Sequence, residues 1–369
     1  MIPFVNLKRQ YETLKPELER AMRQVFADSQ FIQGEAVSQF EREFANYCGA
    51  RFARGVGSGT DALRLGLLAL QLETGSEVLV GAHTFYSCAS TIIECGLRPV
   101  FVDCTQSGEL DTADLARRIS PKTRAIMVVH MYGQAQDMDA IAHVIQRTAF
   151  RIHIIEDCAQ AHGATYKGQK VGTFGSVAAF SFYPTKNLGA YGDGGAVVTN
   201  SSRIARRVER AREYGQTKKY HHASHGTNSR LDSLQAAWLR VKLTHLDAYN
   251  RQRQALAAQY RAQLGHIPEI EQPINDAHRP SVYHLYTITC VRRNELQKHL
   301  LEEGIQTQIH YPIPLHMQAA FAHLGYKSGD FRQAKKRAQK TLSLPIYPEL
   351  SQNEVTKITH TIAKWYEKK

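Results

Sequence analysis

Short apolar runs alternate with longer segments of helical periodicity through the middle of the chain. The runs cover residues 54–57, 77–80, 99–103, 125–129, 152–156, 177–182 and 196–199. Runs of this length, separated by helix-length connections, are typical of a mostly parallel sheet that is buried on both faces. The pattern therefore predicts an α/β fold with a mostly parallel seven-stranded sheet.

Helical periodicity flanks this region on both sides. Residues 10–50 are predicted to be helical, with Phe40, Phe44 and Tyr47 at helical spacing and Gly49 at the end. From residue 230 to about residue 264 the pattern indicates one long or broken helix with a polar later half. The remaining elements are predicted at residues 282–291 (extended), 294–303 (helix, ended by Gly304), 308–312 (extended) and 351–369 (polar helix).

The length of the chain favours two domains. Its 369 residues exceed the usual domain size of about 100 to 200 residues. We expect a large domain at residues 1–245, including an N-terminal arm, and a smaller α+β domain at residues 246–369. The helix that begins near residue 230 is expected to connect them.

The composition is that of an ordinary globular protein, with 43% hydrophobic and 22% charged residues. We find no stretch of about 18 apolar residues and no signal-peptide pattern, so we expect a cytoplasmic protein without a membrane partner. The six cysteines are scattered, without a CxxC pair or a histidine at metal spacing. They are interpreted as buried thiols in a reducing compartment, and no metal site is expected.

The chain is basic, with a formal net charge of +12. Such a charge helps to attract an anionic partner, whether a nucleotide, a phosphate or a nucleic acid. The lysines and arginines are spread along the chain without interleaved aromatic residues, which favours solvated helix faces and predicts no nucleic-acid partner. A basic nucleic-acid-binding protein is the alternative, and its affinity would fall steeply with salt.

Polar and aromatic residues follow several predicted strands, at the edge where parallel sheets bind ligands. Gly59 and Thr60 open a helix after the first run, and the free backbone N–H groups of a helix start suit a phosphate. Phe85 follows the second run, where an aromatic ring either packs in the core or stacks on a planar ligand. Asp157 follows the fifth run and needs a cationic partner, because an unpaired buried carboxylate is costly.

Lys186 lies just beyond the sixth run, between Pro184 and a glycine-rich turn. For a single lysine, a solvated loop position is the ordinary interpretation. Here an anion cradle, an aromatic face, a carboxylate and the hydroxyl of Ser181 accompany it, and these are the groups that pyridoxal phosphate requires. We therefore predict that Lys186 forms the Schiff base with this cofactor, while Asp157 keeps the pyridine nitrogen protonated.

Four ordered segments resemble the sugar-nucleotide aminotransferases of the DegT/DnrJ/StrS type: residues 57–63, 156–164, 181–189 and 228–237. The resemblance extends from residues 3–7 to residues 342–345. It implies the fold of the type I pyridoxal-phosphate enzymes and transfer of an amino group from L-glutamate to a nucleotide-linked keto sugar. It also implies a homodimer with shared active sites.

The resemblance assigns roles to individual residues. Lys186 would carry the cofactor and shuttle the proton, Asp157 would pair with the pyridinium nitrogen, and Gln160 would reach the ring hydroxyl. The remaining cofactor contacts would be Phe85 on the ring, and Gly59, Thr60, Ser181 and Asn228 of the partner subunit at the phosphate. Candidates for contact with the sugar or its diphosphate are Tyr183, Tyr214, His310, Tyr311 and His316; for the last three a packing role is the alternative.

The sequence departs from the family pattern in two places. Cys158 stands where a smaller residue such as alanine is commoner, and we expect it to be tolerated as a small buried side chain. Tyr86, Ser87 and Cys88 stand where the family more often has an aliphatic residue, alanine and threonine. The second departure bears on the shape of the pocket beside Phe85.

The resemblance also indicates a substrate. Residues 228–232 and 303–316 are similar to those of members that aminate C3 of dTDP-3-keto-6-deoxyhexoses. One alternative is a C4-aminotransferase acting on a UDP- or dTDP-4-keto-6-deoxy sugar, and another is a pyridoxal-phosphate-binding regulator without turnover. A dehydratase on the same scaffold is disfavoured, because those members carry histidine in place of Lys186. The sugar epimer and the choice of thymidine or uridine are left open.

Overall fold

A seven-stranded sheet forms the centre of the computed structural model, which describes residues 1–367. The strands are β1 (Phe52–Val56), β2 (Glu77–Gly81), β3 (Arg98–Val102), β4 (Thr123–Val129), β5 (His153–Asp157), β8 (Val177–Ser181) and β9 (Gly195–Thr199). They lie in the order β1-β9-β8-β5-β4-β2-β3. Only β9 runs against its neighbours β1 and β8, so the predicted mostly parallel α/β sheet is confirmed.

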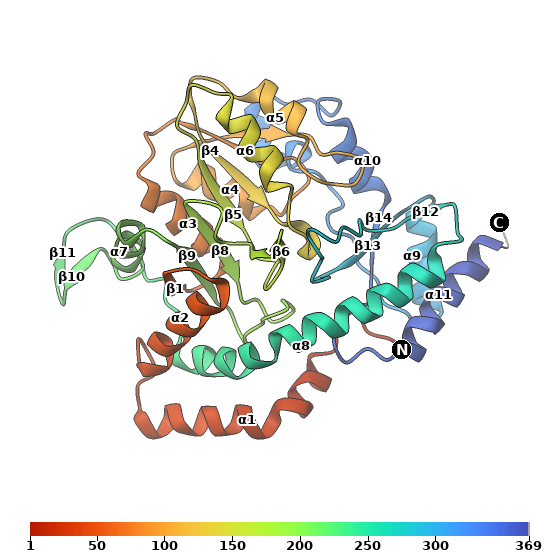
Figure 1. The fold of residues 1–369 in the computed structure, drawn as a ribbon, viewed down its shortest axis with the longest axis horizontal. Helices are drawn as coiled ribbons and strands as arrows, with labels where there is room; N and C mark the ends of the chain where they lie inside the picture. Colours follow the sequence, from red (N-terminus) through yellow and green to blue (C-terminus); the bar gives the residue numbers. More distant parts are fainter. Residues whose placement is uncertain (368–369) are drawn as a thin grey trace.

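Helices cover both faces of this sheet (Figure 1). One apolar cluster joins the sheet to α2 (Glu35–Cys48), α5 (Thr112–Arg118), α6 (Met138–Gln146) and the first half of α8 (Ser233–Leu264). The other joins it to α3 (Gly59–Leu70), α4 (Ser87–Glu94), α7 (Ser202–Ala211) and α10 (Arg332–Lys340). Successive strand residues point to opposite faces, and both faces are buried, which explains why the strands are apolar throughout.

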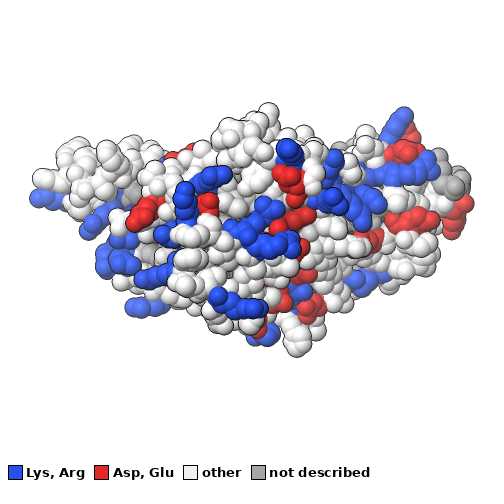
Figure 2. Space-filling view, turned by 90° about the horizontal axis from the view of Figure 1, so that it is seen from above, with Lys and Arg blue, Asp and Glu red and all other residues white. Residues whose placement is uncertain are grey.

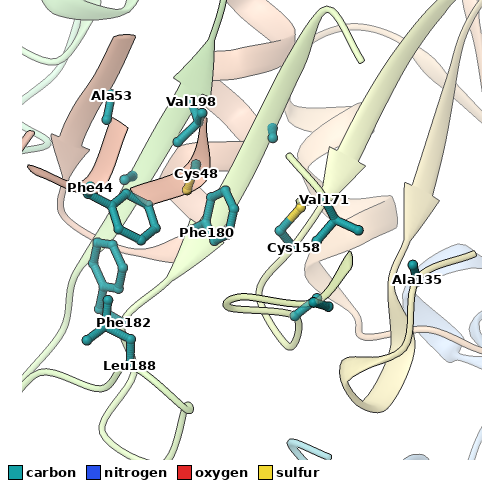
Figure 3. Close-up of a cluster of buried hydrophobic side chains, with 14 of the residues drawn as sticks. Phe44, Cys48, Ala53, Ala135, Cys158, Val171, Phe180, Phe182, Leu188 and Val198 are labelled. Carbon is teal, nitrogen blue, oxygen red and sulfur yellow. The ribbon is translucent and has the colours of Figure 1, made fainter. Parts of the chain in front are cut away.

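Aromatic rings fill the core beneath the β8 strand (Figure 3). Phe44 of α2 packs edge-on against Phe180, with ring centroids 5.0 Å apart, and against Phe182 at 5.3 Å. Edge-to-face pairs of buried rings are favourable beyond the area they bury. Phe180 and Phe182 are therefore anchored, and they fix the backbone from which the loop with Lys186 departs.

Helix α8 connects the sheet to the C-terminal part of the chain (Figure 1). It is a single unbroken helix of 32 residues. The predicted boundary between residues 245 and 246 lies inside it, so the two parts share this helix, and the boundary stays a prediction. Beyond α8, a three-stranded sheet is formed by β12 (Ile270–Glu271), β13 (Tyr286–Cys290) and β14 (Thr341–Leu344).

The C-terminal sheet has its own apolar cluster, which includes α9 (Arg293–Glu302) and α11 (Gln352–Glu367). The extended segment expected at 308–312 is not a strand of this sheet, because only Gln308 pairs with it, through an isolated bridge to Ser343. The helix expected at 351–369 is present as α11, and residues 368–369 lie outside the described part of the chain. The remaining elements are short: η1 (Met131–Gly133), β6 (Thr165–Tyr166), β7 (Gln169–Lys170), β10 (Gln216–Lys218), β11 (His221–His222), η2 (Leu315–Met317) and η3 (Ala319–Leu324).

The N-terminal segment is attached to the C-terminal part. Ile2 forms a parallel bridge with Ile305, in which its N–H donates to the Gly304 carbonyl at 2.7 Å. Phe4 N–H donates to the side chain of Gln306 at 3.2 Å. Helix α1 (Leu7–Asp28) then lies along α8, as Figure 1 shows. Residues 2–5 are thereby placed beside residues that are three hundred positions away.

Charged residues of both signs are mixed on the face shown in Figure 2. Lysines and arginines form several separate groups there, with aspartates and glutamates between many of them. This distribution is consistent with solvated helix faces. Within residues 1–367, no helix has the length and apolar character needed to cross a membrane.

Candidate active site

One cavity of about 580 Å³ brings most of the predicted site residues together. It lies where the carboxyl ends of β5 and β8 and the start of α3 face residues 284–311. The predicted residues that line it are Gly59, Thr60, Phe85, Asp157, Gln160, Ser181, Tyr183, Lys186, His310 and Tyr311. These residues come from five different segments of the sequence, so the fold assembles the site.

The start of α3 forms an anion cradle. Ser58 caps the helix by accepting a hydrogen bond from Asp61 N–H at 3.0 Å. As the first residues of the helix, Gly59 and Thr60 keep backbone N–H groups without intrahelical acceptors. A Cβ added at Gly59 would lie 2.5 Å from Cβ of Ser181, so glycine is needed for this close approach. The unpaired N–H groups and the Ser181 hydroxyl together suit a phosphate.

Asp157 ends β5 with its carboxylate oriented by two donors. Its Oδ1 accepts from Ala159 N–H at 3.0 Å, and its Oδ2 accepts from the thiol of Cys88 at 3.1 Å. Burial raises the pKa of the Cys88 thiol well above its usual value, so the sulfur stays protonated and can donate. Cys88, one of the departures from the family pattern, therefore donates one of the two hydrogen bonds that orient the Asp157 carboxylate.

Glu156, the residue before Asp157, points to the other side of the strand and is fully buried. Its carboxylate accepts from the backbone N–H groups of Gly172, Phe174 and Gly175 at 2.7 to 2.8 Å. His130 lies 3.2 Å from the same carboxylate, and Cys158 is also close. Because backbone donors already occupy the carboxylate, we interpret this cluster as an anchor for the loop 172–175 and not as a metal site.

Lys186 is held in a short loop whose ends are pinned to the core. Its N–H donates to the Tyr183 carbonyl at 2.9 Å. The neighbouring Asn187 side chain donates to Asn250 of α8 at 2.8 Å and to the Val282 carbonyl at 3.0 Å. Burial lowers the pKa of Lys186 to about 8, although the charge of Asp157 opposes this effect. The amine is therefore unprotonated near neutral pH far more often than that of a solvated lysine, although the protonated form still predominates.

Two neutral histidines accompany the lysine in the cavity. The Asn187 amide already donates two hydrogen bonds, so its oxygen accepts from Nδ1 of His284 at 3.3 Å. This leaves Nε2 of His284 as an acceptor. Burial lowers the pKa of His284 well below its usual value and that of His310 to about 4, and the charge of Lys186 acts in the same direction. Neither ring competes with Lys186 for a proton at neutral pH.

Gln160 and Tyr311 are joined in one hydrogen-bonded group. The Gln160 side chain accepts from Tyr132 N–H at 2.6 Å and donates to the Tyr311 hydroxyl at 3.0 Å. The Tyr311 N–H donates to Nε2 of His83 at 3.2 Å. The ring of Phe85 lies 5.5 Å from that of Tyr311 and is 49% exposed. An aromatic face is thus presented on one side of the cavity.

These residues fit pyridoxal phosphate. The α3 start and Ser181 offer donors to the phosphate, Asp157 offers a fixed carboxylate to the pyridine nitrogen, and Phe85 offers a half-exposed ring. Lys186 offers an amine whose lowered pKa suits attack on an aldehyde. All of these groups line the same cavity. The role of each residue stays a prediction.

Three predicted site residues lie outside the cavity lining. Asn228 and Tyr214 are exposed, next to the β10–β11 hairpin. His316 is buried and packs on Phe331, with ring centroids 4.7 Å apart. A contact of Asn228 or Tyr214 with a cofactor or substrate would thus require a second subunit, and His316 packs in the apolar cluster that contains Phe331.

Several lining residues were not among the sequence candidates: Phe4, His284, Gln308 and Arg253. Arg253 falls in the later half of α8, which appeared polar and solvated. Its signal is the spacing of Leu246, Asn250, Arg253 and Ala257, which share one buried face of the helix. Phe4 had no such signal, because the residue it contacts, His310, lies far away in the sequence. Their ring centroids are 5.9 Å apart.

The sequence matches the model of one protein family. Residues 12–363 match the DegT/DnrJ/EryC1/StrS aminotransferase family. The chain is 42% identical over 368 residues to a dTDP-3-amino-3,4,6-trideoxy-alpha-D-glucose transaminase of Streptomyces venezuelae, covering 100% of this chain and 97% of the relative. It is 43% identical over 370 residues to a pleiotropic regulatory protein of Geobacillus stearothermophilus, covering 99% of this chain and 98% of the relative.

Solved structures match the fold over nearly the whole chain. The S. venezuelae DesV crystal structure has a TM-score of 0.96 and 43% identity, covering 99% of this chain and 98% of that one. The structure of NtdA from Bacillus subtilis with bound cofactor PMP has a TM-score of 0.90 and 29% identity, covering 98% of this chain and 85% of that one.

The lowered pKa of Lys186 predicts its reactivity. We expect cyanate to modify Lys186 of the cofactor-free protein with a half-maximal rate near pH 8, because burial disfavours the charged amine. Peptide mass spectrometry over a series of pH values measures the rate at this position. Lys186→Arg is the control for peptide assignment. A half-maximal rate only above about pH 10, the range of a solvated lysine, would contradict the effect of burial.

Proposed function

The chain belongs to the DegT/DnrJ/EryC1/StrS aminotransferase family, and from this premise we propose that it aminates C3 of a dTDP-linked 3-keto-6-deoxyhexose with L-glutamate as donor. It is a pyridoxal-phosphate-dependent sugar aminotransferase. The observation that carries the proposal is the convergence of Lys186, Asp157 and the α3 start on one cavity. The products would be a dTDP-3-amino-3,6-dideoxyhexose and 2-oxoglutarate.

The proposed roles follow from the position of each group. The cofactor, when bound, supplies an electron sink that makes the proton on the amino-bearing carbon acidic. The amine of Lys186 would move that proton, since it is the base with a suitable pKa in the cavity. Asp157 would hold the ring nitrogen protonated, with Cys88 and Ala159 fixing its orientation. Gly59, Thr60 and Ser181 would bind the phosphate.

The substrate class rests on the named relatives and on the lining of the cavity. The S. venezuelae relative is named for a dTDP-3-amino-trideoxyglucose. Apolar side chains line much of the cavity: Phe4, Val5, Leu63, Val129, Met131, Leu285 and Ile346. An apolar lining suits a deoxygenated hexose, which has fewer hydroxyl groups to satisfy.

We also propose that the protein is a homodimer in which each subunit completes the site of the other. The β10–β11 hairpin stands away from the body of the molecule in Figure 1. Asn228 beside it is exposed, and Phe85 and Tyr183 at the cavity are also half exposed. A partner subunit would cover these rings and bring its own Asn228 to the phosphate.

The free cysteines support a reducing, cytoplasmic location.

Product analysis tests the activity. With pyridoxal phosphate, L-glutamate and a dTDP-3-keto-6-deoxyhexose, we expect a sugar that carries the new amino group at C3 by NMR. Lys186→Ala should lower the rate about 10³-fold or more, because it removes the proton-transfer group. Amination at C4 would instead support the alternative aminotransferase. Cofactor binding without any amino transfer would support a regulator.

Hybrid dimers test the shared sites. We expect Lys186→Ala and Asn228→Asp each to be inactive alone, the second because its carboxylate would repel the phosphate. Co-expression of the two chains should restore about one quarter of the wild-type activity, since about half of the dimers are hybrid and each hybrid has one intact site. Differently tagged chains allow the hybrids to be purified and assayed.

A hybrid without activity would mean that Asn228 acts within its own subunit. Full activity of the Asn228→Asp protein alone would mean that Asn228 has no role. A monomer in analytical ultracentrifugation, active at all concentrations, would contradict the dimer itself.

A further inference from the structure

Arg253 is a buried cation that lines the catalytic cavity without an acidic partner. Its side chain comes from α8 and is 4% exposed. Burial lowers its pKa to about 10, so it remains charged at neutral pH. Among the ion pairs of residues 1–367 none involves Arg253, and Glu349 acts on it only at longer range. A buried charge without a counterion is costly, which indicates that an anion is to be supplied.

The guanidinium is oriented with one edge free. Its Nη1 donates to the carbonyls of Ile346 at 2.7 Å and Tyr283 at 3.1 Å. Its Nε is buried without a hydrogen-bond acceptor, and its Nη2 has no acceptor among the residues described here. Nε and Nη2 form the edge of the guanidinium that pairs with both oxygens of a carboxylate. Because Nε is enclosed in this structure, the side chains around it must move for both oxygens to bind. The carbonyls therefore fix the group while leaving its carboxylate-binding edge unpaired.

The other charges of the cavity leave Arg253 available. The cationic side chains among the lining residues are Lys186 and Arg253. With the cofactor bound, Lys186 would hold it and move the proton, and the α3 start would hold its phosphate. The histidines are neutral, because burial lowers their pKa values. Arg253 is the remaining charged group of this subunit that an incoming carboxylate can meet.

We propose that Arg253 binds a carboxylate of the amino donor and so selects an amino acid for the first half of the reaction. The proposal rests on the proposed aminotransferase function. The keto sugar that enters in the second half carries no carboxylate, and its anionic group is the diphosphate. If Arg253 binds the donor and not this diphosphate, its loss affects the first half-reaction selectively. The competing role is structural, in which Nη1 alone joins α8 to residues 283 and 346.

The two half-reactions can be measured separately in Arg253→Gln, and we expect only the first to be impaired. The holoenzyme is titrated with L-glutamate while its visible absorption is followed, and the enzyme loaded with pyridoxamine phosphate is titrated with the keto sugar. We expect the half-saturating glutamate concentration to rise about 30-fold or more, as for loss of a charged hydrogen-bonded partner. The half-reaction with the sugar should stay within about threefold.

Calorimetry with glutarate, an unreactive dicarboxylate, gives a readout without turnover. Arg253→Gln should weaken glutarate binding by the same factor. Arg253→Lys keeps the charge but not the planar edge, so its affinity for glutarate should lie between those of the wild type and Arg253→Gln. Arg251→Gln is the matched control, because Arg251 lies two residues earlier on α8 and is exposed. It should behave as wild type.

Unchanged glutarate binding in Arg253→Gln would overturn the proposal, as would equal losses in both half-reactions. If Arg253→Gln does not fold, the test is made with Arg253→Lys. Glutarate binding by Arg253→Lys as tight as that by the wild type would contradict the proposal. A wild-type holoenzyme that does not respond to glutamate would contradict the proposed donor. In that case glutarate binding still tests Arg253 independently.

Discussion

Burial of the Lys186 amine at the carboxyl ends of the sheet is the constraint on which the rest of the structure depends. A lysine in water is protonated and unreactive, whereas burial lowers the pKa of this one to about 8. The loop that carries Lys186 must therefore be held rigidly, so that the amine stays buried while the cavity stays open. Phe180 and Phe182 anchor the preceding strand in the aromatic core, and Asn187 ties the loop to α8 and to residue 282.

The cavity is completed only when distant segments meet. Helix α8 begins under the central sheet and ends in the C-terminal cluster, so one rigid element positions Asn250 and Arg253 relative to the lysine loop. The N-terminal segment adds Phe4, which lies against His310. Docking of the C-terminal part thus brings neutral histidines and a charged arginine to the same amine.

The strand pattern and the strand-end residues could be predicted from the sequence, because a parallel sheet forces the ends of its strands to one edge. Lys186, Asp157, Ser181 and Gly59 were found in this way, and all line the cavity. Phe4 could not be found from a local pattern, since its place depends on a contact with His310 far along the chain. The helical spacing around Arg253 marks it as buried but does not show that it faces the cavity. Residues 308–312 resembled a strand, but apart from the Gln308 bridge the tertiary contacts place them across the cavity instead of in the sheet.

Locating the covalent bond between cofactor and protein tests the role of Lys186 most directly. The holoenzyme is reduced with borohydride, digested and analysed by peptide mass spectrometry. The pyridoxyl group should be found on Lys186 alone and should be absent from Lys186→Ala. A pyridoxyl group on another lysine, or a holoenzyme that carries none, would contradict the assignment of this cavity as the catalytic site.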